Sequence, residues 1–340
     1  MAAATGLGAV DDGRSPAIGG GDGDAAATTI EDLPADVLAL VLRRLDGASL
    51  AALGCACSSF HDLATDPATW RGLCLAMWPS VRDVPCCGGS DGGVGHRALF
   101  ADAFPFPAPS TLPSPSPAPP SAPVDSARRA SSLPELLVSA VDLHHGGACI
   151  MSRVVETDTA SAWFLGSPFR VDALVQEGFT APSPITPSDL TLSWILIDPS
   201  TGRAVNASSR RPVSVDRKWL TGDVVARFTL VLCDGVALDA AVTCDERHGH
   251  VREVSLCVED GDGGGVSGHD GLAAVAAAMA GARRGLRGAE DEAKRRYREF
   301  VKGKKARKEW KARREGMLDL CCSGVGAAAF VSFLVMLMFR

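Results

Sequence analysis

Signatures of two common enzyme classes are missing from this sequence. Neither a P-loop nor an H-E-x-x-H motif occurs in the 340 residues, so neither a nucleotide phosphate site nor a zincin active site is indicated. The glycines at 88–95 follow no predicted strand and are expected to form a loop. We therefore expect no catalytic residue and no cofactor in this chain.

Disulfide and metal-binding patterns are also missing, although the chain holds 11 cysteines. Their number is odd, and adjacent pairs such as Cys86-Cys87 match neither a disulfide framework nor paired C-x-x-C ligands. The sequence Cys244-x3-His248-x-His250 resembles a metal site, but it falls on an expected hairpin tip and has no second pair of ligands. We interpret it as a plain turn and expect no metal.

The first 29 residues have no long apolar core and consist largely of Ala, Gly and Asp. Residues 1–29 therefore predict neither a secretory signal peptide nor folded structure. The soluble part is expected to lie in the reducing cytosol, with its thiols free.

Apolar periodicity begins at about Ile30 and predicts three short helices over residues 30–78. Pro34 suits the first turn of the first helix, and Asp46-Gly47 ends it. The second helix is expected from Ser49 and the third from Asp66-Pro67. Such a module buries only a small core, which a partner would stabilise. The apolar residues of the first helix lie at three- and four-residue spacing: Leu33, Val37, Leu38, Val41, Leu42 and Leu45.

Residues 79–132 are rich in Gly and Pro and predict a linker. Residues 101–126 contain nine prolines, a composition typical of extended chain between domains.

From about Leu133 to residue 260 the apolar period changes to two, and no helix as long as ten residues is expected. The Asp234-Gly235 pair predicts a hairpin. Short strands separated by tight turns predict an antiparallel β-sandwich-like domain, with Trp163, Phe164, Trp194 and Phe228 in its core. The expected strands are Leu137–Leu143, Ala148–Val155, Ala162–Leu165, Phe169–Leu174, Leu190–Ile197, Val224–Cys233, Val236–Thr243 and Val251–Val258. The fold class is therefore α+β, with several domains.

The C-terminal part predicts a flexible break at residues 261–271 and a helix over residues 272–316, first Ala-rich and then basic. Residues 283–314 hold 15 Lys and Arg against five acids, although the whole chain has a net charge of −6. A basic segment with its own partner is indicated, and anionic lipid is favoured over nucleic acid because an apolar segment follows.

Residues 317–340 contain nineteen consecutive uncharged residues, from Cys321 to Phe339. That length approaches a bilayer core and predicts a single-pass transmembrane tail anchor, with the N-terminus in the cytosol. A half-span or a helix lying on the surface remains an alternative, because Gly324–Ala329 is only mildly apolar. Cys321 and Cys322 are candidates for palmitoylation.

The segment from Leu33 to Cys74 resembles an F-box. The matching residues, in order, are Leu33, Pro34, Val37, Leu38, Leu45, Leu50, Leu53, Cys57 and Trp70. The resemblance implies docking on a Skp-type adaptor and, through it, on a cullin and a RING ligase. The resemblance therefore implies that the protein is a substrate receptor of an SCF ubiquitin ligase.

The whole layout, and the stretches Ser152–Leu174, Leu190–Pro199 and Ser208–Asp223, resemble a group of plant F-box proteins. In that group the β domain would bind an unknown protein substrate. Its faint similarity to phloem-lectin-like sandwiches comes without a recognisable sugar-site motif.

Arg210-Arg211 and Arg217-Lys218-Trp219 lie in one expected loop and are candidates for binding an acidic or phosphorylated partner. The alternative is a solvated loop with Trp219 in the core. Two other functions stay open: a membrane-anchored non-ligase adaptor whose β domain binds a carbohydrate or lipid, and a soluble enzyme.

Overall fold

The computed structural model describes residues 33–85, 95–108, 133–175, 178–181, 184–232, 235–245, 249–262, 264–285 and 288–340. The chain divides into two compact units, one ending at Arg44 and the other beginning at Leu45. The described part of the first unit holds the helix α1 (Ala35–Leu42). Residues 1–29 and the Pro-rich segment 109–132, for which we predicted disorder and a linker, lie outside the described residues.

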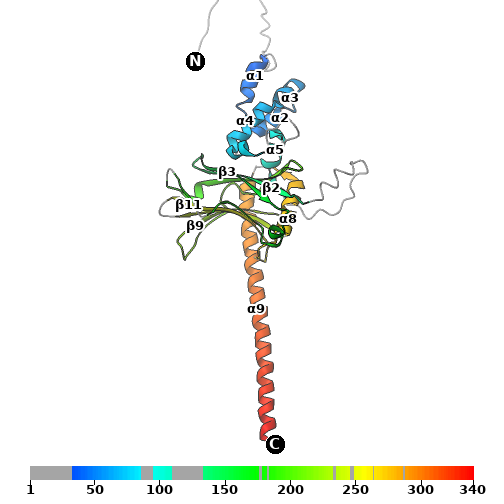
Figure 1. Ribbon diagram of the computed structural model, residues 1–340, viewed down its shortest axis with the longest axis vertical. Helices are drawn as coiled ribbons and strands as arrows, with labels where there is room; N and C mark the ends of the chain where they lie inside the picture. The colour runs from blue at the N-terminus through cyan, green and yellow to red at the C-terminus, as the bar shows by residue number, and fades with distance from the viewer. Residues whose placement is uncertain are drawn as a thin grey trace, which may run out of the picture. The chain divides into compact units, whose positions relative to one another are not determined.

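Two antiparallel sheets form the β domain of the second unit (Figure 1). The first has the order β3-β2-β6-β7 and the second the order β4-β11-β10-β9-β8, with β5 also paired to β11. The strands of the first sheet are β2 (Leu136–His145), β3 (Ala148–Asp158), β6 (Leu190–Asp198) and β7 (Arg203–Asn206). Those of the second are β4 (Arg170–Leu174), β5 (Phe179–Thr180), β8 (Ser214–Arg217), β9 (Val224–Val231), β10 (Ala237–Asp245) and β11 (His250–Glu259).

One hydrophobic core lies between the two sheets, as the period of two predicts. Leu192, Trp194 and Leu196 point inward from β6, and Phe228 and Leu238 meet them from the second sheet. The predicted antiparallel β-rich domain after an N-terminal helical region is therefore confirmed, and with it the α+β class.

A group of helices, which we call the helical layer, precedes the sandwich, and its last elements lie on the outer face of the first sheet. Its elements are α2 (Gly47–Leu53), α3 (Ser58–Ala64), α4 (Pro67–Met77), the 3-10 turn η2 (Pro79–Asp83) and α5 (His96–Ala103). The turn η2 contacts β2 and β3, and α5 contacts β7. Val138 and Ile195, which point away from the sandwich core, are buried as well. The first sheet thus buries apolar side chains on both faces.

A partly buried set of hydrogen bonds ties α5 to the sandwich. Asp102 at the end of α5 accepts a hydrogen bond from Arg203 Nε at 2.9 Å and one from the Ala204 backbone N–H at 3.1 Å. Arg283 donates to the Asp102 carbonyl at 2.9 Å and to the Ala204 carbonyl at 2.8 Å. Beside it, β1 (Phe106–Pro107) pairs with β12 (Arg283–Arg284). Asp102 and Arg283 thus satisfy backbone groups from three segments.

Three predictions about these elements are wrong. Residues 79–85 and 95–108 are not a linker, because η2, α5 and β1 form there and pack on the sheets. Ala162–Leu165 is not a strand: Ser161 caps the short helix α7 (Ala162–Gly166) by accepting from the Phe164 N–H. The expected loop after β6 contains β7 and β8. The structure also has four short helices before η2 where three were expected.

The predicted helix over residues 272–316 is two helices separated by β12. The first, α8 (Gly268–Ala280), starts inside the expected flexible break, where Ser267 caps it by accepting from the Asp270 N–H. The second, α9 (Ala289–Met338), follows Gly288, whose φ is +70°. A left-handed residue suits glycine and explains the interruption.

Within the described part of the chain, none of the helices combines the length and the apolar character that crossing a membrane requires. The predicted transmembrane helix in residues 317–340 is therefore not confirmed.

Candidate functional site

The helix α1 presents an apolar stripe to solvent. Pro34 stands at its N-cap, where the missing N–H costs nothing. Leu33, Val37, Leu40 and Val41 are exposed, at spacings that place them on neighbouring turns of one side. Contiguous exposed apolar side chains are typical of a binding surface. Of the predicted adaptor-binding residues in this unit, only Leu38 is buried.

In the helical layer, an aspartate caps the N-terminus of α2 and another caps that of α4. The Asp46 carboxylate accepts from the Ser49 N–H at 2.7 Å, and this bond lowers the pKa of Asp46. Asp66 caps α4 by accepting from the Thr69 N–H at 3.0 Å. Asp46 therefore begins the second helix rather than ending the first.

The remaining predicted adaptor-binding residues are divided by the structure into core and half-buried positions. Leu50 and Trp70 are buried, and the Trp70 indole N–H donates to the Ala64 carbonyl at 2.7 Å. Leu45, Leu53 and Cys57 are half-buried. Leu50 and Trp70 thus hold the helices together rather than offering a surface.

Phe100 of α5 completes this core and was missed from the sequence. Its ring lies 5.3 Å from Trp70, 5.8 Å from Trp78 and 4.4 Å from Phe104, centre to centre. The signal was present in Leu99, Phe100 and Ala103, which recur at helical spacing. It was hidden because glycines before it and prolines after it predicted a linker.

Comparison with known proteins agrees with this geometry. The F-box-like family matches residues 30–76. A probable F-box protein of Arabidopsis thaliana is 39% identical over 92% of this chain and 96% of its own length. The chain belongs to the plant F-box protein family. Two further Arabidopsis F-box proteins are 38% and 35% identical over 88% and 91% of the chain, covering 86% and 95% of their own lengths. No solved structure matches this F-box protein.

The five predicted substrate-binding residues do not form one site. Arg210 has φ +63° and is half-buried, with its guanidinium over the rings of Phe104 and Phe106 at 5.0 and 5.1 Å. It donates to the Phe104 carbonyl, and burial lowers its pKa to about 10. Arg211 pairs with Glu290 of α9 at 3.1 Å. We therefore interpret Arg210 as a structural residue that holds the chain after α5.

Arg217, Lys218 and Trp219 lie instead at the turn between β8 and β9, which we call the tip (residues 217–223). Trp219 is 91% exposed and Leu220 is 76% exposed, so the alternative that Trp219 is a core residue is wrong. Asp223 at the base of the tip lies 3.5 Å from Arg252 of β11. Trp and Arg are among the residue types that contribute most to binding energy in protein interfaces.

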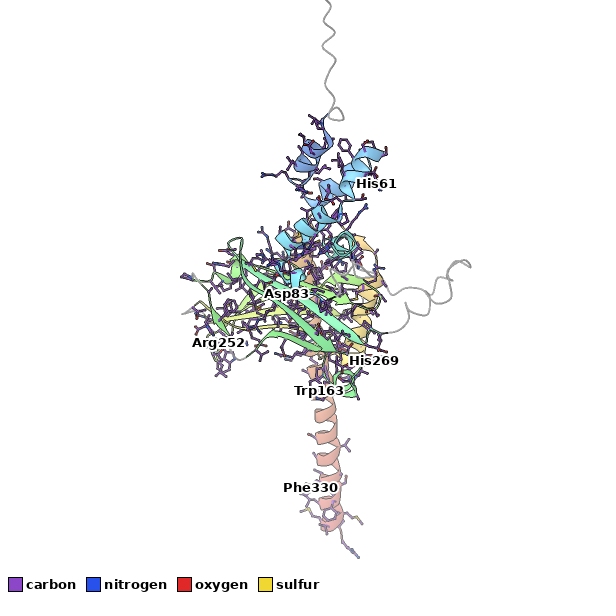
Figure 2. The ribbon with its side chains drawn as sticks, turned by 45° about the horizontal axis from the view of Figure 1, so that its top comes forward. His61, Asp83, Trp163, Arg252, His269 and Phe330 are labelled. Atoms are coloured by element: carbon purple, nitrogen blue, oxygen red, sulfur yellow. The ribbon has the colours of Figure 1, made fainter. Side chains whose placement is uncertain are left out.

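A second exposed tryptophan lies at the opposite end of the same sheet. Trp163 of α7 is 79% exposed, against the prediction of a core position, whereas Phe164 beside it is buried. β4 follows α7 and begins at Arg170, which pairs with Cys257 near the end of β11. Arg252, near the start of β11, lies beside Asp223 of the tip. Figure 2 shows Arg252 apart from Trp163, so Trp163 is not part of the tip.

The described residues contain no cluster of three or more His, Cys, Asp or Glu that could hold a metal ion. Cys244 is buried, which raises the pKa of its thiol to about 12, and His250 Nδ1 lies 3.2 Å from the Thr180 hydroxyl. His248 lies outside the described residues. The interpretation of the segment from Cys244 to His250 as a turn agrees with the hairpin that β10 and β11 form.

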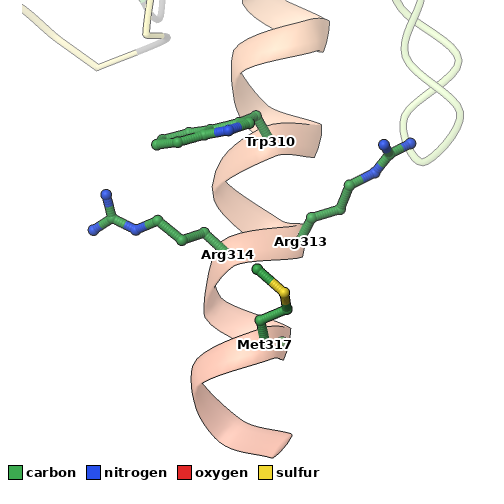
Figure 3. A pocket seen from close by; sticks show the side chains of 5 residues that line it. Trp310, Arg313, Arg314 and Met317 are labelled. Atoms are coloured by element: carbon green, nitrogen blue, oxygen red, sulfur yellow. The ribbon is translucent and has the colours of Figure 1, made fainter. Parts of the chain in front are cut away.

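The middle of α9 carries a basic and aromatic surface. Trp310 is 63% exposed, and the Arg314 guanidinium lies 5.3 Å from the centre of its ring. Figure 3 shows Arg313 directed to the other side of the helix and Met317 one turn further along. The side chains of Cys321 and Cys322, the palmitoylation candidates, lie outside the described residues.

Proposed function

We propose that this F-box protein is the substrate-recognition subunit of an SCF-type ubiquitin ligase. F-box proteins generally act as substrate adaptors of SCF ubiquitin ligases, and they are typically non-enzymatic subunits of the complex. The observation that carries the proposal is the exposed stripe of α1 within the matched F-box segment. It would lie on a Skp-type adaptor, which binds a cullin and a RING ligase.

The proposal divides the labour between the two ends of the described chain. The helices would present the adaptor-binding stripe, and the sandwich would bind a protein substrate through the tip. Support for the second part comes from the exposure of Trp219 and Leu220 and from the charge of Arg217 and Lys218. No step of bond chemistry is assigned to this chain.

The decisive experiment is capture of adaptor and cullin by the full-length protein. Leu33→Ala combined with Pro34→Ala should remove adaptor binding, because Leu33 belongs to the exposed stripe and Pro34, which is also exposed, adjoins it at the N-cap. Leu33 and Pro34 support no described core, so thermal unfolding should be unchanged. Trp163→Ala, a comparably exposed apolar residue outside the F-box segment, is the matched control.

If the double variant captures as much adaptor as the wild type does, the proposal is wrong. Capture of the adaptor without a cullin would favour the other candidate, a non-ligase adaptor whose β domain binds a carbohydrate or lipid.

We also propose that residues 317–340 attach the protein to a membrane, with the preceding domains in the cytosol. The seven consecutive apolar residues 333–339 cover every side of the helix, because a helix has 3.6 residues per turn. A groove in a protein would cover one side, whereas lipid would cover all of them. The exposed apolar residues are Val325, Phe330, Val331, Phe333, Leu334, Val335, Met336, Leu337, Met338 and Phe339.

Trp310, Arg313 and Arg314 support this proposal, because tryptophan and cations favour the headgroup region at the start of a membrane-bound segment. Membrane fractionation of the full-length protein, with and without residues 317–340, tests the attachment. Retention at high pH after carbonate extraction would indicate a spanning segment, and release would indicate a helix on the surface. Equal solubility of both proteins would contradict any attachment.

A further inference from the structure

The first group of side chains on α9 holds the helix to the sandwich. Lys304 pairs with Glu259 of β11 at 2.8 Å. Arg307 pairs with Asp262, just after β11, at 3.0 Å. Phe300, one turn before Lys304, is buried. Phe300, Lys304 and Arg307 therefore mark the side of α9 that faces the sandwich.

A second group of side chains lies on the opposite side of α9 and is positively charged. Arg298, Lys302 and Lys305 are exposed, and their four- and three-residue spacing places them on one side of the helix. Each of them precedes one residue of the first group by two positions, which is about 200° around a helix with 3.6 residues per turn. Within the part of the chain that the structure describes, their side chains form no ion pair. We call these three residues the cation stripe.

The positive charge of the cation stripe is not balanced by the helix itself. Arg298 and Lys302 are four positions apart and Lys302 and Lys305 three, so neighbouring cations of the stripe repel one another. Arg313 continues the same side of the helix, and Glu309 between Lys305 and Arg313 is the single acid there. An anionic partner on this side would relieve the repulsion.

An anionic lipid leaflet fits the stripe better than an acidic protein segment does. The stripe leads along α9 to the exposed apolar residues of the proposed membrane attachment. Near an anionic leaflet each Lys or Arg strengthens binding by a factor of about five, so three together give roughly a hundredfold. An exposed ion pair with a carboxylate of a protein usually gives less, because two long side chains lose their freedom in each pair.

The length of α9 restricts how the helix can lie on such a leaflet. Figure 1 shows α9 continuing beyond the sandwich as one helix. If it stood perpendicular to a membrane that begins at Met317, Lys305 would lie roughly 18 Å and Arg298 roughly 28 Å above the lipid. Exposed charges are screened beyond about 8 Å at physiological salt, so the stripe would be out of reach of the headgroups. An inclined helix brings the stripe to the headgroups, and the sandwich on the opposite side does not obstruct it.

We propose that the cation stripe binds the surface of an anionic lipid leaflet, so that α9 is inclined to the membrane and holds the sandwich on its far side. This proposal rests on the proposed membrane attachment, and it names the class of lipid and the orientation of the helix. The ion pairs of Lys304 and Arg307 then fix the sandwich to the lipid-bound helix.

Co-sedimentation of the full-length protein with vesicles tests the class of lipid. Phosphatidylcholine vesicles measure the attachment alone, and phosphatidylcholine vesicles that contain phosphatidylserine add the anionic headgroups. The wild type should bind the second kind roughly a hundredfold more tightly, and added salt should reduce the difference. The combined substitution Arg298→Ala, Lys302→Ala and Lys305→Ala should remove most of this preference and leave binding to phosphatidylcholine unchanged.

The matched control removes the same charge from exposed positions of the helical layer, through Arg71→Ala, Arg82→Ala and Arg97→Ala. It should keep the preference for phosphatidylserine. An equal loss in both triple variants would show an effect of net charge only and would overturn the proposal.

The wild type also separates this proposal from the membrane attachment. Equal binding to both kinds of vesicle would overturn the lipid class and leave the attachment standing, whereas binding to neither would contradict both. Stripe-dependent binding of polyglutamate without a preference for phosphatidylserine would assign the stripe to an acidic protein and would also overturn the proposal.

Acetylation of lysines in the wild-type protein, followed by mass spectrometry, tests the inclination of α9. Contact with headgroups should slow the modification of Lys302 and Lys305 severalfold when vesicles with phosphatidylserine are added. Lys218, at the tip of the sandwich, is exposed as well and should react at an unchanged rate. Protection of Lys311 alone would indicate a helix that stands upright, and it would overturn the proposed inclination.

Discussion

Ser80 and Asp142 lie 62 positions apart in the chain, and the Ser80 hydroxyl donates to the Asp142 carboxylate at 2.6 Å. The Ser80 backbone N–H donates to the other carboxylate oxygen at 3.0 Å. Ser80 belongs to η2 and Asp142 to β2, and both are fully buried. The helical layer is therefore fixed to the sandwich by a two-bond contact, so a substrate on the tip keeps a defined position relative to these helices.

Ser80→Ala should destabilise the protein by about 1–3 kcal/mol, because it removes one of the hydrogen bonds to a buried carboxylate. The free energy of unfolding from urea denaturation measures the effect. Ser59→Ala, at an exposed position of α3, serves as the control and should change stability by less than ~0.5 kcal/mol. Equal effects of the two substitutions would show that the Ser80–Asp142 contact does not hold the layers together.

Asp142 should also give stability a pH dependence of unusual sign. Burial raises its pKa above the ordinary 3.8, although the Ser80 bonds oppose the shift. Between 3.8 and the raised pKa the folded chain binds more protons than the unfolded chain, so the contribution of Asp142 to stability falls as pH rises through that window. Asp142→Asn should therefore gain stability relative to wild type as pH rises from below 3.8 to neutral.

Asp270 supplies the opposite control for this pH experiment. Hydrogen bonds from His269 and then Ser267 lower its pKa, so its stabilisation is present above 3.8 and is lost as pH falls through the folded pKa. Asp270→Asn should lose stability relative to wild type as pH rises. Urea denaturation at several pH values measures both differences, and the same sign for the two variants would contradict the assignment.

The alternation of side chains predicted most of the sandwich, because strands with one buried face must repeat every second residue. Leu190, Leu192, Trp194 and Leu196 are all buried, as expected. The short strand β8 escaped prediction because Val215, Asp216 and Arg217 are all exposed and leave no alternation to detect. An edge strand with so few buried side chains is therefore nearly invisible in the sequence.

Residue type alone misassigned Arg210, which was grouped with the tip by its charge. Arg210→Ala should destabilise the protein by about 1–3 kcal/mol, since it removes the contacts with Phe104 and Phe106 and leaves the Phe104 carbonyl without its donor. Arg211→Ala should change stability by less than ~1 kcal/mol, because its ion pair with Glu290 is exposed. Thermal unfolding compares the two, and a larger loss for Arg211→Ala would reverse the assignment.

Gly47 shows a requirement of the F-box core that no sequence pattern reveals. It is buried at the first position of α2, and a Cβ atom there would overlap the ring of Phe100. The ring cannot move aside easily, because Trp70, Trp78 and Phe104 pack around it. Gly47→Ala should therefore cost about 1–3 kcal/mol through overpacking.

Gly72 provides the matched substitution, because it lies inside α4 and a Cβ there would meet nothing within 4 Å. Gly72→Ala should stabilise the protein by about 0.5–1 kcal/mol, since alanine loses less conformational entropy in a helix. Urea denaturation gives both values, and adaptor capture shows whether the disturbed core also weakens binding. Stabilisation by Gly47→Ala would mean that Phe100 can move away from α2, and the core would then be looser than its ring contacts imply.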